Sequence, residues 1–219
     1  MHDPIYLQEE HRMLRDQLRR FIDEEVLPHG ETWERDGVVP REIVRKMGEL
    51  GFFGIRYPEA HGGAELETIA TMVLSEELGR STFGGFAITV LVHTDMASPH
   101  LANAGTEAQK AKYLPRIISG ELVTAVGVTE PDAGSDVAGI RTRATKTNGG
   151  WILNGSKMFI TNGVYGDLYF VAAKSGEGGG RLREVTIFIL EKGTEGFSVA
   201  RPLEKMGWRS SDLSLIHIS

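Results

Sequence analysis

Hydrophobic positions in the first half of the chain recur about every three to four residues, the spacing of one face of an α-helix. Three helices are predicted: one with Leu7, His11, Leu14, Leu18, Phe21, Ile22 and Val26 on one face, ended by Pro28; one with Ile43, Val44, Met47 and Leu50, between Pro40 and Gly51; and one with Leu66, Ile69, Ala70, Val73, Leu74 and Leu78, closed by Gly79. Residues 83–104 are expected to be helical in pieces. The capping-box pattern of Thr106 to Gln109 predicts a further helix that ends near Gly120.

After Gly120 the hydrophobic spacing shortens and becomes typical of β-strands. Strands are predicted at residues 123–128, 141–146, 151–154, 168–173, 185–190 and 197–202, with a hairpin turn at Asn148-Gly149 and a flexible loop at residues 176–180. Helices followed by strands, without alternation, indicate two segregated domains. The predicted fold class is α+β, with an all-α helical domain at residues 4–120 and a β-barrel-like or sandwich-like domain at residues 121–212.

Composition narrows the classes of protein. The chain has 219 residues, a formal net charge of −6 and no cysteine. An acidic chain with interleaved charges argues against a nucleic-acid partner, and the lack of cysteine excludes disulfides and thiolate catalysis.

No apolar run is long enough to span a membrane, and residues 1–25 lack the character of a signal or transit peptide. No histidine pair has metal-ligand spacing and no Rossmann glycine pattern opens a helix, so neither a metal nor a dinucleotide site of that kind is predicted.

Two segments rich in small and hydroxyl-bearing residues carry the candidate chemistry. The first, residues 126–139, leaves an apolar strand and reads Val-Gly-Val-Thr-Glu-Pro-Asp-Ala-Gly-Ser-Asp-Val-Ala-Gly. The second, residues 154–163, reads Asn-Gly-Ser-Lys-Met-Phe-Ile-Thr-Asn-Gly. Either segment alone also fits an ordinary turn at the end of a strand. Their occurrence together favours a ligand site.

The residue types suit a flavin. Small residues beside a strand end let backbone amides approach a planar ligand closely. Hydroxyl groups are neutral donors for the carbonyl and ring-nitrogen acceptors of the isoalloxazine, and they are supplied by Thr129, Ser135 and Thr161. Phe159 offers an aromatic ring for packing. The acidic residues Glu130, Asp132 and Asp136 suggest either proton transfer or turn and cap roles, and we expect the latter.

The paired segments resemble the flavin-contacting segments of the acyl-CoA dehydrogenase family. The first matches the family signature at each constrained position, namely Gly127, Val128, Thr129, Glu130, Gly134, Ser135, Asp136 and Gly139, and the second follows at the family's spacing. The resemblance covers about residues 7–212. It implies an N-terminal helical domain and a middle β-domain, with a truncation before the family's C-terminal helical bundle.

The resemblance also implies FAD as the cofactor and assigns residues to it. The implied cofactor-binding residues are Val126, Gly127, Val128, Thr129, Glu130, Pro131, Asp132, Ala133, Gly134, Ser135, Phe159, Ile160 and Thr161. Ser135 is also expected to meet the acyl-CoA substrate, and the hydroxyl of Thr161 is expected near flavin N5. Many family members have tryptophan at the position of Phe159, which leaves electron transfer to a partner less certain.

The activity implied by the resemblance is α,β-dehydrogenation of an acyl-CoA thioester to a trans-2-enoyl-CoA in fatty acid metabolism, with hydride transfer to FAD. Its implied partners are an electron-transfer flavoprotein and, in the full-length form, three further copies in a homotetramer. The implied location is the cytoplasm of a bacterium or the mitochondrial matrix of a eukaryote. The family's catalytic glutamate lies in the C-terminal domain, so no catalytic residue is assigned and the chain alone is expected to be inactive. The alternatives are an acyl-CoA oxidase, a flavin-dependent monooxygenase or a non-catalytic fragment that binds acyl-CoA or flavin.

The last seven residues, 213–219, read Leu-Ser-Leu-Ile-His-Ile-Ser. They resemble one translated frame of a transposase adapter used in sequencing libraries and are predicted to be a non-native tail, the alternative being a genuine terminal strand. On the first interpretation the strand that the family has after Asp212 is missing, and a sheet edge is left unpaired.

Overall fold

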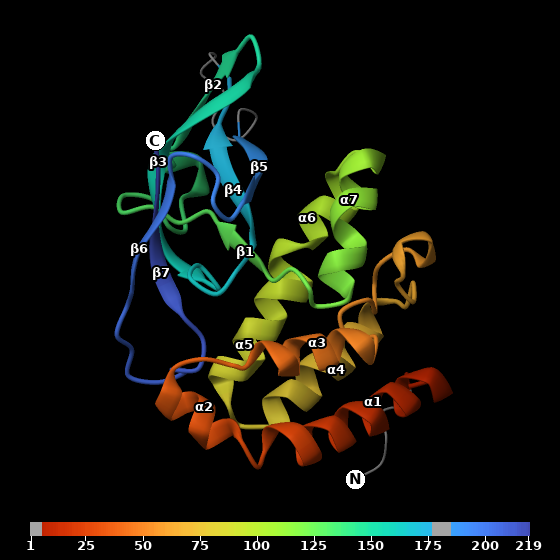
Figure 1. Ribbon diagram of the computed structural model, residues 1–219. Helices are drawn as coiled ribbons and strands as arrows, with labels where there is room; N and C mark the ends of the chain where they lie inside the picture. Colours follow the sequence, from red (N-terminus) through yellow and green to blue (C-terminus); the bar gives the residue numbers. More distant parts are fainter. Residues whose placement is uncertain (1–5, 177–184) are drawn as a thin grey trace.

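A computed structural model describes residues 6–176 and 185–219 and divides into a helical half and a β half (Figure 1). The helical half contains α1 (Glu9–Phe21), η1 (Ile22–Val26), α2 (Gly30–Asp36), α3 (Arg41–Glu49), η2 (Glu59–His61), α4 (Thr68–Arg80), α5 (Gly84–Leu91), η3 (Val92–Ala97), α6 (Pro99–Ala104) and α7 (Glu107–Ile118). The β half contains β1 (Thr124–Gly127), η4 (Val137–Gly139), β2 (Arg143–Thr147), β3 (Gly150–Thr161), β4 (Leu168–Lys174), β5 (Val185–Glu191), β6 (Phe197–Pro202) and β7 (Leu213–Ile218). The α+β fold class, with a helical domain before a β-domain, is confirmed.

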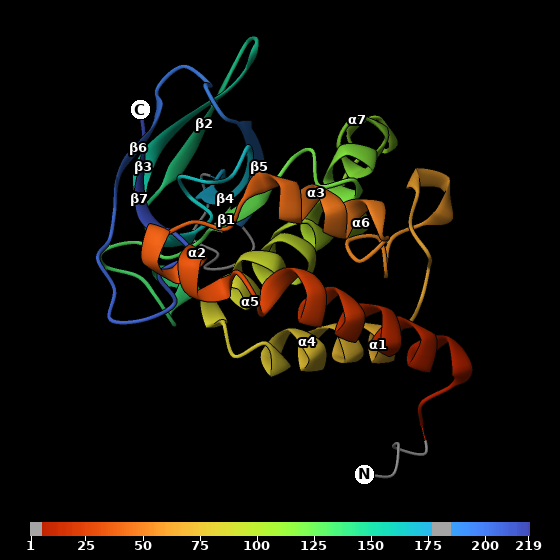
Figure 2. The same ribbon diagram turned by 60° about the horizontal axis from the view of Figure 1, so that its bottom comes forward.

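The helical domain is organised around α1 and α4, which lie side by side (Figure 2). Leu18, Ile22 and Val26 of the predicted apolar face are fully buried in the helical core. A buried carboxylate also joins the two helices, since Glu77 of α4 accepts from Arg19 at 3.0 Å and from Arg80 at 3.0 Å. The amphipathic face predicted from the sequence therefore forms the core of this domain.

The helix boundaries follow the predicted signals with one exception. Pro40 immediately precedes α3, and Gly51 after it has a left-handed φ of +80°. Gly79, however, lies inside α4, which continues to Arg80, so the prediction that it closes the helix is wrong. The left-handed turn falls at Thr82 instead, with φ +62°. The hydroxyl of Ser81 donates to the carbonyl of Leu78 and satisfies the helix end that a closing glycine would otherwise serve.

The capping box predicted at Thr106 is confirmed. The Thr106 hydroxyl accepts from the amide of Gln109 at 3.3 Å, and the Gln109 side chain accepts from the Thr106 amide at 2.9 Å. Replacing Thr106 by alanine removes one partner of an otherwise free helix-end amide. We expect a loss of about 1 kcal/mol in the free energy of unfolding, measured by urea denaturation. Thr106→Ser keeps the hydroxyl and should behave like the unchanged chain; equal losses for both variants would contradict the capping role.

Two helices contain a π-helical segment that the sequence pattern did not indicate. The chain passes from α1 directly into η1 and from α5 directly into η3. Residues 83–104, predicted as helical in pieces, are accordingly α5, η3 and α6. The short helix α2 was not predicted, because its seven residues contain no apolar repeat.

The strands form one mixed sheet in the order β1-β4-β2-β3-β7-β6, with β5 paired to β4. β1 runs parallel to β4, and β2 and β3 form the antiparallel hairpin predicted at Asn148-Gly149. β3 is longer than the predicted strand at 151–154, because its first half pairs with β2 and its second half with β7. The loop predicted at residues 176–180 lies almost wholly outside the described residues.

Residues 213–218 form β7, which lies between β3 and β6. The expectation of an unpaired sheet edge after Asp212 is therefore wrong for this structure. Strand formation does not bear on the origin of these seven residues, and their non-native character stays a prediction.

The two domains contact each other through apolar side chains and through an ion pair. Leu168 and Phe170 of β4 are buried against Leu101 of α6 and Leu114 of α7. Just before β4, both carboxylate oxygens of Asp167 accept from the guanidinium of Arg41 on α3, at 2.7 and 3.2 Å. Figure 1 shows α6 and α7 beside β4 and β5 and α3 below β1.

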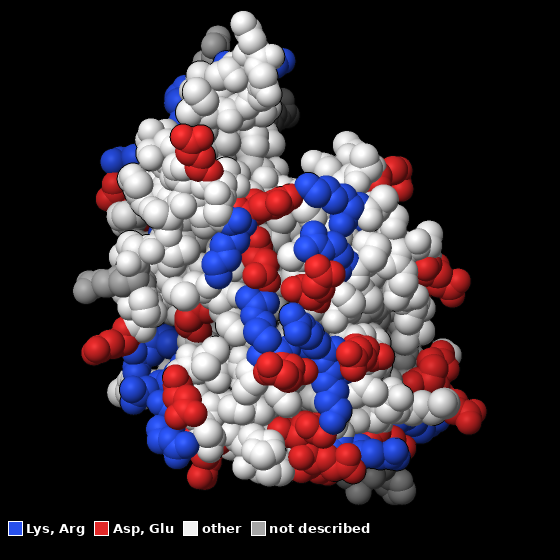
Figure 3. Space-filling view, viewed as in Figure 1, with Lys and Arg blue, Asp and Glu red and all other residues white. Residues whose placement is uncertain are grey.

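Charged side chains of both signs are interspersed on the face in Figure 3. That face carries no continuous basic surface of the kind that binds nucleic acid. Within residues 6–176 and 185–219, no helix has the length and apolarity needed to cross a membrane.

Candidate cofactor site

The fold brings the two sequence segments to one cavity of about 170 Å³. It is lined by Val126, Val128 and Thr129 from the first segment, Phe159, Ile160 and Thr161 from the second, and Val92 and Met96 from η3. The two segments are also joined directly, since the amide of Met158 donates to the carbonyl of Thr129 at 2.9 Å. The sequence prediction that these segments act together is thus matched by their geometry.

A buried lysine fixes the spacing between the segments. Lys157 is 1% exposed, and its ammonium donates to the carbonyl of Val128 at 3.0 Å and to the carboxylate of Glu130 at 2.7 Å. The stem of Lys157 also packs against Gly127, where an added Cβ would lie 3.4 Å from its Cγ. One side chain of the second segment therefore contacts Gly127, Val128 and Glu130 of the first.

Glu130 has a structural environment rather than one suited to proton transfer. Besides Lys157, its carboxylate accepts from the amides of Arg141 and Thr142, at 2.5 and 2.9 Å, and from the Thr142 hydroxyl at 2.5 Å. Burial alone would raise the pKa of Glu130, but these donors together lower it below its usual value. The group is therefore ionised and fully occupied at neutral pH, which agrees with the expected turn role.

Phe159 combines exposure with an unusual backbone. Its φ is +59°, and its side chain is 54% exposed at an irregularity in the pairing of β3 with β7. A left-handed conformation at an aromatic residue costs on the order of 1–3 kcal/mol and commonly marks a functional position. The structure thus presents this ring at the mouth of the cavity instead of burying it in the core.

The remaining predicted residues are close to the cavity in sequence but do not line it. Ala133 is buried against Ile140 and Ala172, while Pro131, Asp132, Gly134 and Ser135 are exposed. Asp132 forms an ion pair with Arg141 at 2.8 Å. Contact of these residues with a cofactor, and of Ser135 with a substrate, stays a prediction.

Val92 and Met96 of η3 are the lining residues that sequence reasoning missed. Their placement depends on His93, which is 2% exposed. Its Nδ1 accepts from the amide of Thr124 at 3.1 Å, and its Nε2 lies 3.1 Å from the carbonyl of Ile117. This arrangement fits the neutral tautomer with the proton on Nε2, so His93 has a structural role. The only sequence signal for them was the closely spaced apolar residues of 88–97. Such a pattern does not tell whether a side chain is buried in the core or lines a cavity.

Comparison with known proteins gives the same division. Residues 8–121 match the family model for the acyl-CoA dehydrogenase N-terminal domain, and residues 125–219 match the model for its middle domain. The mouse mitochondrial long-chain specific acyl-CoA dehydrogenase is 40% identical over 93% of this chain and 47% of its own length. The chain therefore spans about half the length of the curated relatives it matches.

Solved structures show the same similarity in three dimensions. The acyl-CoA dehydrogenase of Geobacillus kaustophilus has a TM-score of 0.93 at 39% identity, over 99% of this chain and 57% of that one. A Bacillus anthracis acyl-CoA dehydrogenase complexed with FAD has a TM-score of 0.89 at 33% identity, over 100% of this chain and 37% of that one. A structure described as an electron transferring flavoprotein of Acidaminococcus fermentans has a TM-score of 0.93 at 34% identity, over 99% of this chain and 57% of that one.

The fold and the cavity together define a two-domain α+β protein whose paired loops meet at a helix of the preceding domain. The helical domain and the β-domain match the N-terminal and middle domain models of one family, in that order. The chain belongs to the acyl-CoA dehydrogenase family.

Proposed function

We propose that this chain supplies the helical and middle domains of an FAD-dependent dehydrogenase that introduces an α,β double bond into an acyl-CoA thioester. The observation that carries the proposal is the single cavity formed by the two flavin-type segments and η3. The flavin supplies the acceptor for the hydride when it is bound. The residues of this chain bind it, orient it and exclude water from it.

The cavity has suitable chemistry for one edge of an isoalloxazine ring. Two hydroxyls, from Thr129 and Thr161, are set among the apolar side chains of Val126, Val128 and Ile160. A neutral, planar ring with several acceptors prefers such an environment to one with fixed charge. At about 170 Å³ the cavity receives part of the ring and not a whole FAD.

The lining residues are suited to binding and not to removal of the substrate's α-proton. The described residues that line this cavity include no carboxylate. Glu130, the nearest acid in sequence, is held by Lys157 and Thr142. We therefore infer that the base is supplied by the family's C-terminal helical domain, and that Ser135 on the exposed loop contacts the acyl-CoA.

The finer assignments follow from the family and stay proposals. We infer an enzyme of the bacterial cytoplasm, or of the mitochondrial matrix in a eukaryote, that passes electrons to an electron-transfer flavoprotein and forms a homotetramer as a full-length protein. The similarity to a structure described as an electron transferring flavoprotein supports the proposed electron-transfer partner.

Thr161→Val tests the site in the chain of 219 residues. The variant keeps the shape of the side chain but removes one donor to the flavin. We expect the dissociation constant for FAD to rise about tenfold, which corresponds to one lost hydrogen bond. Titration of FAD with protein, followed by quenching of flavin fluorescence, measures it.

Two further variants serve as controls. Thr145→Val changes an exposed threonine on β2, outside the cavity, and should leave the dissociation constant unchanged. Phe159→Trp should keep the flavin bound, since the ring remains at the cavity mouth. Equal affinity of Thr161→Val and the unchanged chain would refute the assignment of Thr161, and no detectable FAD binding by any form would refute the proposed flavin site in this chain.

A further inference from the structure

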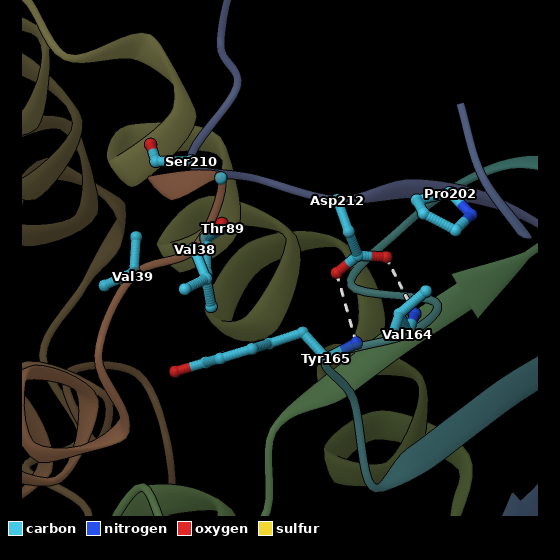
Figure 4. Close-up of a pocket in the computed structure, with 9 residues that line it drawn as sticks. Val38, Val39, Thr89, Val164, Tyr165, Pro202, Ser210 and Asp212 are labelled. Atoms are coloured by element: carbon cyan, nitrogen blue, oxygen red, sulfur yellow. Dashed lines mark hydrogen bonds between the residues drawn. The ribbon is translucent and has the colours of Figure 1, made fainter. Parts of the chain in front are cut away.

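A second cavity, of about 200 Å³, lies between the helical domain and the β-domain. Val38 and Val39 from the segment between α2 and α3, with Thr89 from α5, form one side, and Val164 and Tyr165 from the turn between β3 and β4 form the other (Figure 4). Gly37, Pro202, Ser210 and Asp212 complete the lining. None of these residues lines the flavin-type cavity, so this pocket is a separate site.

Two residues that line this interdomain pocket have hydroxyl groups without partners among the described residues. Thr89 is 3% exposed, and its Oγ1 has no hydrogen-bond partner among the described residues. The hydroxyl of Tyr165 is also buried and unpartnered within the described part of the chain. Buried polar groups in native proteins are nearly always satisfied, so a pair of free hydroxyls lining one cavity indicates a missing partner.

The walls and the mouth are apolar. Val39 is 1% exposed, whereas Val38 and Val164 are 43% and 40% exposed and form the mouth. Such a mouth gives a small molecule access from solvent without unfolding of the domain interface. A dry cavity of about 150 Å³ lined by apolar side chains is large enough to bind benzene, so the larger pocket here accommodates a single substituted ring.

The lining of the pocket disfavours ionised ligands. Both oxygens of Asp212 are already in use, since they accept from the amides of Val164 and Tyr165 at 2.7 and 3.1 Å. The Ser210 hydroxyl donates to Glu34 and is likewise engaged. A carboxylate in the lining disfavours an anion, and the apolar walls provide poor solvation for an ion of either sign.

We propose that the interdomain pocket binds a compact uncharged molecule, a single ring with one hydrogen-bond-accepting oxygen, whose oxygen is bound by the hydroxyls of Thr89 and Tyr165. The remainder of the ring packs on Val38, Val39 and Val164. This inference stands apart from the proposed dehydrogenase function, because no residue of the flavin-type cavity is required for it.

The two cavities nevertheless share structural elements. Thr89 lies one helical turn before Val92, and Val164 follows Thr161 by three residues. Asn162 joins these elements, since its side-chain amide donates to the carbonyls of Thr89 and Thr124, at 3.0 and 3.2 Å. An occupant of the pocket therefore contacts α5 and the turn after β3, which adjoin two of the elements that line the flavin-type cavity.

The test uses the whole chain with labelled valine methyl groups and two probes of matched shape, acetophenone and ethylbenzene. Acetophenone should shift the methyl signals of Val38, Val39 and Val164 in a saturable manner. Ethylbenzene, which lacks the oxygen, should bind about tenfold more weakly. Tyr165→Phe and Thr89→Val should each reduce that difference, with unfolding midpoints recorded to verify that both variants fold.

A blocking variant supplies the second arm. Val38→Trp fills the mouth and should abolish the saturable shifts of Val39 and Val164, whereas Leu27→Trp places the same ring at an exposed position outside the pocket and should leave them unchanged. Unsaturable shifts, unaltered binding to Val38→Trp, or equal affinity of the unchanged chain for both probes would each overturn the proposal. The last outcome would mean that the hydroxyls are satisfied by water only.

Discussion

Replacing Lys157 by methionine is expected to lower the free energy of unfolding by about 3–5 kcal/mol, the usual cost of removing one partner of a buried ion pair. Methionine fills much of the space of the lysine stem but leaves Glu130 as a buried charge without its main counter-ion. It also removes the donor to the carbonyl of Val128. Because both contacts fix the first segment to the second, the same variant should bind FAD more weakly than the unchanged chain.

Urea denaturation at pH 7.5 measures the loss in stability. Lys146→Met makes the same replacement at an exposed position of β2 and should change the free energy of unfolding by less than about 0.5 kcal/mol. The double variant Glu130→Gln, Lys157→Met removes both charges and should recover part of the loss, which gives the pair a favourable coupling energy in a double-mutant cycle. A loss below about 1 kcal/mol for Lys157→Met would show that the pair contributes little to the fold.

Acidification from pH 7.5 to pH 5 is expected to lower the free energy of unfolding by about 2 kcal/mol through His93 alone. Burial lowers the pKa of His93 to about 4, although its contact with the Ile117 carbonyl partly opposes the shift. In the unfolded chain a histidine titrates near pH 6.5, so between the two values only the unfolded state takes up the proton. The contribution is complete above about pH 6.5 and is lost as the pH falls toward 4.

The variant His93→Gln isolates this contribution. It should be less stable at pH 7.5, because it disturbs the contacts of η3 with Thr124 and Ile117. Its stability should nevertheless fall less steeply with acid, by about 1.4 kcal/mol per pH unit in the range where only the unfolded histidine titrates. His29→Gln makes the same replacement at an exposed histidine and is the matched control. Parallel pH profiles for His93→Gln and the unchanged chain would show that His93 does not remain neutral in the fold.

The sequence was informative wherever a signal is local. The capping box at Thr106, the Asn148-Gly149 hairpin and the change from helices to strands after Gly120 each depend on a few neighbouring residues, and each is found in the structure. The two segments that line the cavity were recognised for the same reason. Their residue order constrains a loop whatever surrounds it.

Long-range pairing was the part that the sequence could not provide. Glu130 and Lys157 are separated by 27 residues, and nothing near either residue identifies the other as its partner. The full length of β3 depends on β7, and the lining residues Val92 and Met96 lie on a different domain from the motifs. These features are decided by tertiary contacts, which override local pattern.

The π-helical segment η3 has a consequence for how this site changes over generations. A π-turn accommodates one residue more than an α-turn and is equivalent to a single-residue insertion in a helix. Removing one residue from Val92–Ala97 would restore α-helical geometry and rotate the following side chains by about 100° about the helix axis. Met96 would then leave the cavity wall and a neighbour would take its place. A single insertion or deletion can therefore change several of the side chains that form this wall at once, whereas a point substitution changes only one.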